Sequence, residues 1–280
     1  MTALPPQSPA IEFVSRGDAG PAVLFVPGSY STAAAWRGVW AHLPADWQYA
    51  ATSLLGCGAT TETRRPGNAD MPHELAVVRA AAARMGGGPV HLVGHSFGGT
   101  VALAAVLDHT FEVASLALFE ANPFNLIADN GPLYGAACDL AREFAAALEA
   151  GDPDAAGRII DYWGGTGTFA AMPPKVQDFC RRAARANALD WETCLGFRLD
   201  LSEFAALDFP VMLVRGEGAI PAMIAITDAL GACLPAARQE VVEEAGRFLV
   251  STHPKICAAL LAEHLARTDV APATDEGRPT

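Results

Sequence analysis

Lysine, long apolar runs and paired metal ligands are scarce in this sequence, and each scarcity excludes a class of function. Only two of the 280 residues are lysines, Lys175 and Lys255, and the formal net charge is −12. A surface with this charge repels phosphate backbones and anionic lipid, so we expect neither nucleic acid nor a membrane as a partner. No apolar run reaches the ~18 residues of a membrane span, and the first ten residues do not resemble a secretion signal.

The six cysteines and seven histidines are scattered along the chain. They form no CxxC, HxH or HExxH pattern, so we expect reduced thiols in a cytoplasmic protein and no metal site. Neither a dinucleotide-binding fingerprint nor a P-loop is present, so no cofactor is implied. A small molecule is the expected partner, and the sequence leaves a homodimer open.

What is abundant is material for a packed core, because 51% of the residues are hydrophobic and only 18% are charged. Along most of the chain, short apolar runs alternate with segments in which the apolar residues are spaced as on one face of a helix. This rhythm predicts an α/β fold with a mostly parallel central sheet flanked by helices. Strands are expected at Ile11–Ser15, Val23–Val26, Trp47–Ala51, Val90–Val93, Val113–Phe119, Val211–Arg215 and Arg238–Glu243.

The rhythm stops after Glu120 and resumes near Val211. The segment between contains helical stretches around Leu140–Ala150, Gly157–Tyr162 and Val176–Ala186, separated by glycines and prolines. We therefore predict a core formed by residues 1–121 and 207–266, a helical cap formed by residues 122–206, and a disordered tail formed by residues 267–280.

The most informative motif is Gly94-His95-Ser96-Phe97-Gly98, between an apolar strand and an Ala/Leu-rich helix. A strand that turns abruptly into a helix forces its central residue into a strained backbone conformation and leaves no room for side chains two positions away. Ser96 would then project from the strand end as a nucleophile, and the amide of Phe97 would face a developing oxyanion. The alternative is a glycine-rich turn of purely structural use.

The chain at this point resembles the α/β-hydrolase superfamily over roughly residues 11–266. The resemblance rests on GHSFGG at 94–99 and on the Val23–Gly28 strand and turn. In that family the residue after the turn supplies the second oxyanion amide, which the resemblance assigns to Ser29. Pro27 replaces the usual histidine of the turn, a residue that is supportive and not catalytic.

A catalytic acid is expected from the same resemblance. Many members place it after the strand at 211–215, where this chain has Ala219 and, nearby, Glu217. Lactonase-like members instead place a glutamate at the end of the preceding strand, where this chain has Glu120. We favour Glu120, which would point into the site from a strand end; a salt bridge to the cap is the alternative role.

The catalytic base is where the sequence departs from the family pattern. The position of the usual histidine is occupied by Arg247, and a guanidinium cannot accept the serine proton. His253 is the less favoured candidate base, because it precedes Pro254 at a helix start. We expect Arg247 to pair with Glu120 at the floor of the pocket, which leaves a fixed cation beside the oxyanion hole.

Four further residues are expected to line the substrate pocket, namely Tyr30, His95, Phe124 and Trp163. The sequence as a whole predicts an enzyme of the esterase or lactonase type that acts on a small, largely apolar carbonyl substrate. In this reading Ser96 is the nucleophile and the base is non-standard. The alternatives are a non-hydrolytic cyclase, lyase or isomerase that uses the oxyanion hole and Arg247, and an inactive protein that only binds a ligand.

Overall fold

The computed structural model describes residues 10–268 except residues 110, 200, 205–206 and 235. The last helix includes Arg267 and Thr268, which the sequence had suggested as the start of a disordered tail. The remainder of that tail, residues 269–280, lies outside the described residues.

A seven-stranded sheet forms the centre of the molecule, in the order β1-β3-β2-β4-β5-β6-β7. The strands are β1 (Phe13–Arg16), β2 (Ala19–Val26), β3 (Trp47–Thr52), β4 (Val90–His95), β5 (Val113–Phe119), β6 (Val211–Gly216) and β7 (Arg238–Val242). Only β1 is antiparallel to its neighbour, and the other paired strands run parallel. Each strand overlaps its predicted run, so the predicted mostly parallel sheet is confirmed.

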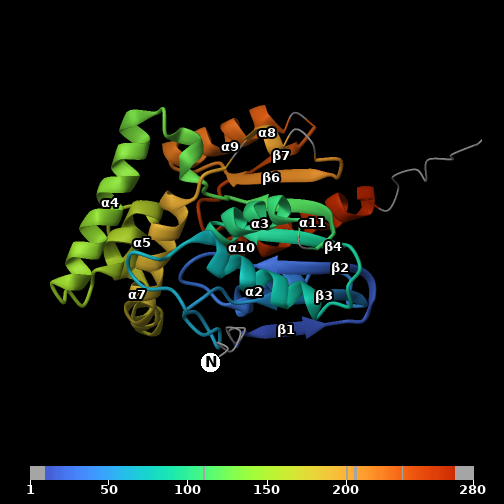
Figure 1. Cartoon of the computed structure of the whole chain (residues 1–280), viewed down its shortest axis with the longest axis horizontal. Helices are drawn as coiled ribbons and strands as arrows, with labels where there is room; N and C mark the ends of the chain where they lie inside the picture. Colours follow the sequence, from blue (N-terminus) through green and yellow to red (C-terminus); the bar gives the residue numbers. More distant parts are fainter. Residues whose placement is uncertain (1–9, 110, 200, 205–206, 235, 269–280) are drawn as a thin grey trace, which may run out of the picture.

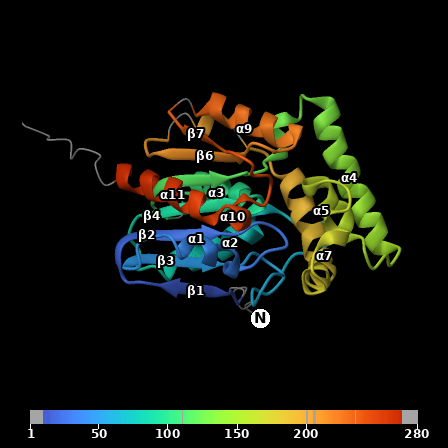
Figure 2. The ribbon, with the colours of Figure 1, turned by 180° about the vertical axis from the view of Figure 1, so that it is seen from behind.

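Helices cover both faces of this sheet, because its strands are apolar on both sides. In β2, Leu24 and Val26 belong to one buried cluster, whereas Val23 and Phe25 belong to the other. Figures 1 and 2 show the two helical layers. The first contains α2 (Met71–Ala83), α3 (Phe97–Asp108) and α9 (Pro221–Cys233). The second contains η1 (Ala33–Trp36), α1 (Arg37–Trp40), α10 (Leu249–Thr252) and α11 (Pro254–Thr268).

The segment between β5 and β6, here called the helical insertion (residues 122–206), contains no strand among its described residues. Its helices are η2 (Phe124–Ile127), α4 (Gly131–Glu149), α5 (Ala156–Gly164), α6 (Thr168–Ala171), α7 (Pro174–Gly196) and α8 (Leu201–Phe204). Figure 1 shows α4, α5 and α7 together at the end of the sheet toward which the arrow of β2 points. The insertion therefore lies over the carboxyl ends of the parallel strands.

Two helices of the insertion are longer than the sequence pattern predicts. Helix α4 begins at Gly131, well before Leu140, because a proline is tolerated in the first turn of a helix. Helix α7 continues past Ala186 to Gly196. Its added residues include Asp190 and Trp191, both buried, so tertiary packing extends this helix beyond its local signal.

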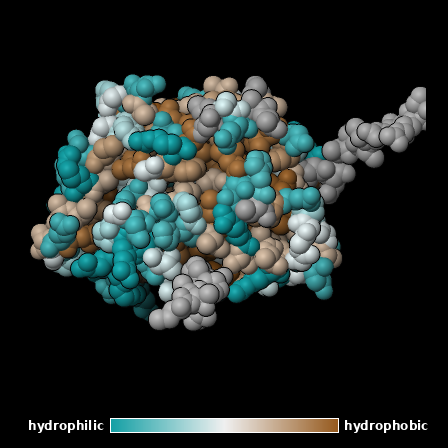
Figure 3. Space-filling view, viewed as in Figure 1, coloured by the Kyte–Doolittle hydropathy of each residue, from teal (hydrophilic) through white to brown (hydrophobic). Residues whose placement is uncertain are grey.

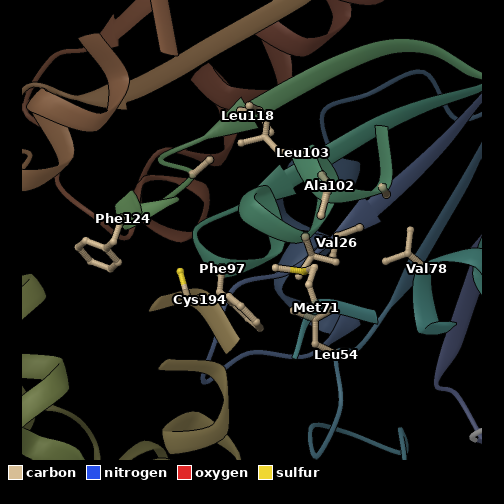
Figure 4. Close-up of a cluster of buried hydrophobic side chains, with 14 of the residues drawn as sticks. Val26, Leu54, Met71, Val78, Phe97, Ala102, Leu103, Leu118, Phe124 and Cys194 are labelled. Atoms are coloured by element: carbon tan, nitrogen blue, oxygen red, sulfur yellow. The ribbon is translucent and has the colours of Figure 1, made fainter. Parts of the chain in front are cut away.

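The larger buried cluster continues from the sheet into the insertion. Figure 4 shows it running from Val26 and Leu118 of the sheet, through Leu103 of α3, to Phe124 and Cys194. In Figure 3 hydrophilic residues are spread over the visible surface, and hydrophobic ones gather in its upper half. Across the described ranges, no helix is both long enough and apolar enough to cross a membrane.

Candidate active site

Ser96 occupies a sharp turn between β4 and α3. Its backbone has φ 57° and ψ −127°, a conformation that costs a non-glycine residue about 1–3 kcal/mol. The flanking glycines are required by space, because a Cβ on Gly94 would lie 2.6 Å from the Cα of Gly99, and one on Gly98 would lie 2.2 Å from the carbonyl oxygen of Pro27. The local sequence therefore builds the strained turn that the motif predicts.

The loop that follows β2 packs directly against this turn. A Cβ on Gly28 would lie 2.7 Å from the Cβ of Ser96, and the next residue, Ser29, lines the same cavity as Ser96. Among the described residues, the backbone hydrogen bonds formed outside helices and strands include none from the amide of Ser29 or the amide of Phe97. An oxyanion hole requires two amides without such partners near the reacting hydroxyl.

Glu120 lies immediately after β5 and is 1% exposed. Its backbone also has a positive φ of 49°. The amide of Gly216, at the end of β6, donates to its Oε1 over 3.0 Å. Because β5 and β6 are neighbouring parallel strands, their carboxyl ends lie side by side and hold this carboxylate near Ser96.

Arg247 joins the serine to the glutamate. Its Nη2 donates to Ser96 Oγ, while its Nη1 donates to the Glu120 carbonyl oxygen over 2.6 Å and lies 3.3 Å from Oε2. The indole of Trp163 covers the guanidinium at 4.0 Å from its ring centroid. The predicted pair of Arg247 with Glu120 is therefore present, and the same guanidinium contacts the hydroxyl of Ser96.

The side chain of Arg247 is buried, and that burial lowers the pKa of its guanidinium, which the charge of Glu120 opposes. A paired guanidinium has donors and no acceptor, so Ser96 Oγ can only accept from it. Arg247 therefore cannot accept the proton of the Ser96 hydroxyl. The arrangement holds a positive charge, and not a base, against the hydroxyl.

The two histidines that the sequence places near the site do not contact Ser96 Oγ in the described structure. His95 Nε2 lies 3.0 Å from the carbonyl oxygen of Arg247, which implies that this nitrogen carries a proton. Burial, followed by the charge of Arg247, lowers the pKa of His95 to about 3, so the ring is neutral. His253 pairs with the hydroxyl of Thr252 over 2.8 Å and does not line the cavity above Ser96.

A cavity of about 430 Å³ opens above Ser96, between the sheet and the helical insertion. The lining of this cavity includes Tyr30, His95, Phe124 and Trp163. Most of the lining is apolar, and Trp191 of α7 stacks on both Phe124 and Trp163. The volume and the lining suit a small, largely apolar molecule.

A buried polar cluster that the sequence did not predict borders this cavity. Arg64 lies 2.9 Å from both Glu74 of α2 and Asp190 of α7, and the second oxygen of Asp190 accepts from Ser29 Oγ over 2.7 Å. Arg64 also pairs with Glu62. Glu62, Arg64 and Glu74 are near one another in the chain, but Ser29 and Asp190 are distant from them and the five residues form no motif, so no local signal could have indicated the cluster. No group of three or more potential metal ligands occurs within the described residues.

Comparison with known proteins supports the fold independently. Residues 21–152 match the family of the α/β-hydrolase fold. Among solved structures, an α/β hydrolase from Sphaerobacter thermophilus superposes with a TM-score of 0.68 at 20% identity, covering 91% of this chain and 95% of the other. A thermophilic esterase from Thermogutta terrifontis gives 0.70 at 20% identity, with 95% and 96% covered.

Carboxylesterase CesB from Bacillus subtilis gives a TM-score of 0.70 at 16% identity, covering 93% of this chain and 89% of its own. No curated protein sequence matches the chain. At such identities the structures establish the fold alone. The chain therefore has the α/β-hydrolase fold, and its residues 21–152 are similar to that family.

Proposed function

We propose that this protein hydrolyses small, largely apolar esters or lactones, with Ser96 as the nucleophile and Arg247 as a source of charge stabilisation in place of a base. One observation carries the proposal: the guanidinium of Arg247 donates to the hydroxyl of Ser96, which lies in the strained turn between β4 and α3 and lines a cavity. Amides of Ser29 and Phe97 are available to hold the oxyanion of the tetrahedral intermediate.

The chemical problem is the proton of Ser96. A nearby opposite charge favours the ionised form of a group, so Arg247 stabilises the alkoxide relative to the hydroxyl. Water or hydroxide in the cavity then takes the proton that no side chain accepts. The carboxylate of Glu120 partly cancels the cation, but it pairs with Nη1, whereas the hydroxyl contacts Nη2.

The cavity limits the substrate. Its aromatic and aliphatic lining favours apolar chains, and a volume of about 430 Å³ admits only a small molecule. Similarity of fold to esterases is consistent with ester chemistry, although fold by itself does not determine the reaction.

The test is the pH dependence of kcat/KM for p-nitrophenyl butyrate, with Ser96→Ala as the control. We expect turnover that depends on Ser96 and rises about tenfold per pH unit from pH 6 to 9, because hydroxide concentration, and not a histidine, supplies the proton acceptor. A fluorophosphonate should label Ser96 with the same dependence. Turnover equal to that of Ser96→Ala across this range would refute the proposal.

A second candidate is a non-hydrolytic cyclase, lyase or isomerase on the same site. The observation that favours it is the buried pair of Arg247 with Glu120, which holds a cation beside the oxyanion hole without deprotonating Ser96. Such a site can stabilise an enolate. This candidate predicts tight binding of small ketones or carboxylates with neither labelling nor ester turnover. Binding without any chemistry would instead identify an inactive relative.

A further inference from the structure

The loop that follows β2 has little support from its own main chain. Among the described residues, the backbone hydrogen bonds formed outside helices and strands include none to or from residues 28–30. Tyr30 also has a positive φ of 54°, which an aromatic residue rarely adopts. Such a strained conformation persists only where surrounding contacts hold it, so the position of Ser29 depends on contacts with other parts of the chain.

The helical insertion provides such a contact through Asp190. The hydroxyl of Ser29 donates to Oδ2 of Asp190 over 2.7 Å, although the two residues are 161 positions apart in the chain. Asp190 lies on α7, is 3% exposed, and lines the same cavity as Ser29 and Ser96. A hydrogen bond to an ionised carboxylate is roughly twice as strong as one between neutral groups, so this contact can hold the loop in place.

Asp190 is itself fixed by Arg64, which is also buried. Nη1 of Arg64 lies 2.9 Å from Oδ1 of Asp190 and 2.9 Å from Oε1 of Glu74 on α2. Nη2 of Arg64 donates over 3.3 Å to the carbonyl oxygen of Leu55, in the loop after β3. The charge of Arg64 opposes the rise that burial causes in the pKa of Asp190, and so favours the ionised carboxylate. A series of buried contacts therefore connects the α/β core, through Asp190, to Ser29.

We propose that Asp190 is a positioning residue, which holds the amide of Ser29 in the place where it stabilises the oxyanion. This inference rests on the proposed function, since it takes that amide to be part of the oxyanion hole. Asp190 does not touch the reacting atoms and acts only through the hydroxyl of Ser29. The helical insertion therefore determines the rate of the chemical step as well as which substrate binds, because one of its helices holds the loop that carries this amide.

Ser29→Ala tests this inference directly, because it keeps the amide and removes only the hydroxyl. We expect kcat for p-nitrophenyl butyrate to fall about 10- to 100-fold with KM unchanged, as displacement of one donor from the developing charge predicts. Ser29→Thr retains the hydroxyl and should retain most of the activity. Asp190→Ala should lower kcat by a similar factor, and Ser29→Ala added to it should cause no further loss, because both changes break the same contact.

The matched control is Thr193→Val in the same buried cluster. Thr193 is three residues after Asp190 on α7, and it accepts from Nη1 of Arg64 over 3.4 Å without lining the described cavity. This change removes a hydrogen bond from the arginine but leaves the contact between Asp190 and Ser29, so kcat and KM should stay unchanged. A loss of kcat as large as that of Ser29→Ala would overturn the inference, because it would show that any disturbance of the cluster has this effect.

A binding measurement separates this inference from the proposed hydrolysis. Calorimetric titration compares butylboronic acid, which forms a tetrahedral anion on a serine hydroxyl, with N-phenylbutyramide, whose carbonyl stays planar. Ser29→Ala should weaken binding of the boronic acid about 10-fold or more and leave binding of the amide unchanged, because the oxyanion exists only in the tetrahedral adduct.

Three results of this titration would overturn the inference. They are equal affinity of the wild type and Ser29→Ala for the boronic acid, an equal loss of affinity for both ligands, and no binding of the boronic acid to the wild type. Binding of the boronic acid that depends on the Ser29 hydroxyl, without any ester turnover, would instead refute the proposed hydrolysis and leave the positioning role of Asp190 standing.

Discussion

Replacing Arg247 by histidine should convert the site to conventional ester hydrolysis. The two Nη atoms of Arg247 contact Ser96 Oγ and the carboxylate of Glu120, which are the partners that the two ring nitrogens of a catalytic imidazole would take. The amide of Gly216 already orients that carboxylate. Only a proton acceptor is missing, so Arg247→His supplies the one absent group.

The magnitude follows from what a general base contributes. A positioned base accelerates acyl transfer by about 10²–10⁴-fold, which corresponds to about 2.7–5.5 kcal/mol of transition-state stabilisation. We expect kcat/KM for p-nitrophenyl butyrate to rise by that factor at pH 7. The pH profile should also level off above pH ~6.5, since an unperturbed imidazole is deprotonated there.

Three controls accompany this variant. Arg247→Lys retains a cation without providing a base at neutral pH, and should show no gain. Arg247→His combined with Ser96→Ala should be inactive. Because imidazole is shorter than the arginine side chain, Arg247→Gly with added free imidazole tests the same idea without relying on the length of residue 247. If the folded Arg247→His variant and the rescued glycine variant both show no gain, the absence of a base is not what limits the site.

Two further predictions concern stability. Gly98→Ala should lower the free energy of unfolding by about 1–3 kcal/mol or more, because the added Cβ would lie 2.2 Å from the carbonyl oxygen of Pro27. In contrast, Gly135→Ala in α4 meets nothing within 4 Å and should raise the free energy of unfolding by about 0.5–1 kcal/mol. Urea titration measures both changes. Burial raises the pKa of Glu74 from 4.5 to about 8 despite Arg64, so between these pH values the folded state holds a proton that the unfolded state has released. The free energy of unfolding should therefore fall as pH rises from 4.5 towards 8 and level off above that. Glu74→Gln should flatten that slope, and an unchanged slope would exclude this role for Glu74.

Much of the fold could be predicted from local sequence. Short apolar runs predicted the seven strands, and the glycines two positions either side of Ser96 predicted the sharp turn. The extent of α7 could not be predicted, because its last two turns are stabilised by residues such as Asp190 and Trp191 that pack only against distant parts of the chain. Periodicity describes a helix's own face and not the partner that buries it.

Residue identity and order were enough to predict a serine at a strained turn and an arginine in the position of the expected base. The sequence could not show that Arg247 contacts both Ser96 and Glu120, or that Arg64, Glu74 and Asp190 meet beside the cavity, because the packing of the folded chain brings these residues together. Contacts between residues of different strands, helices and loops depend on how those elements pack, and the chemistry of this site lies in those contacts.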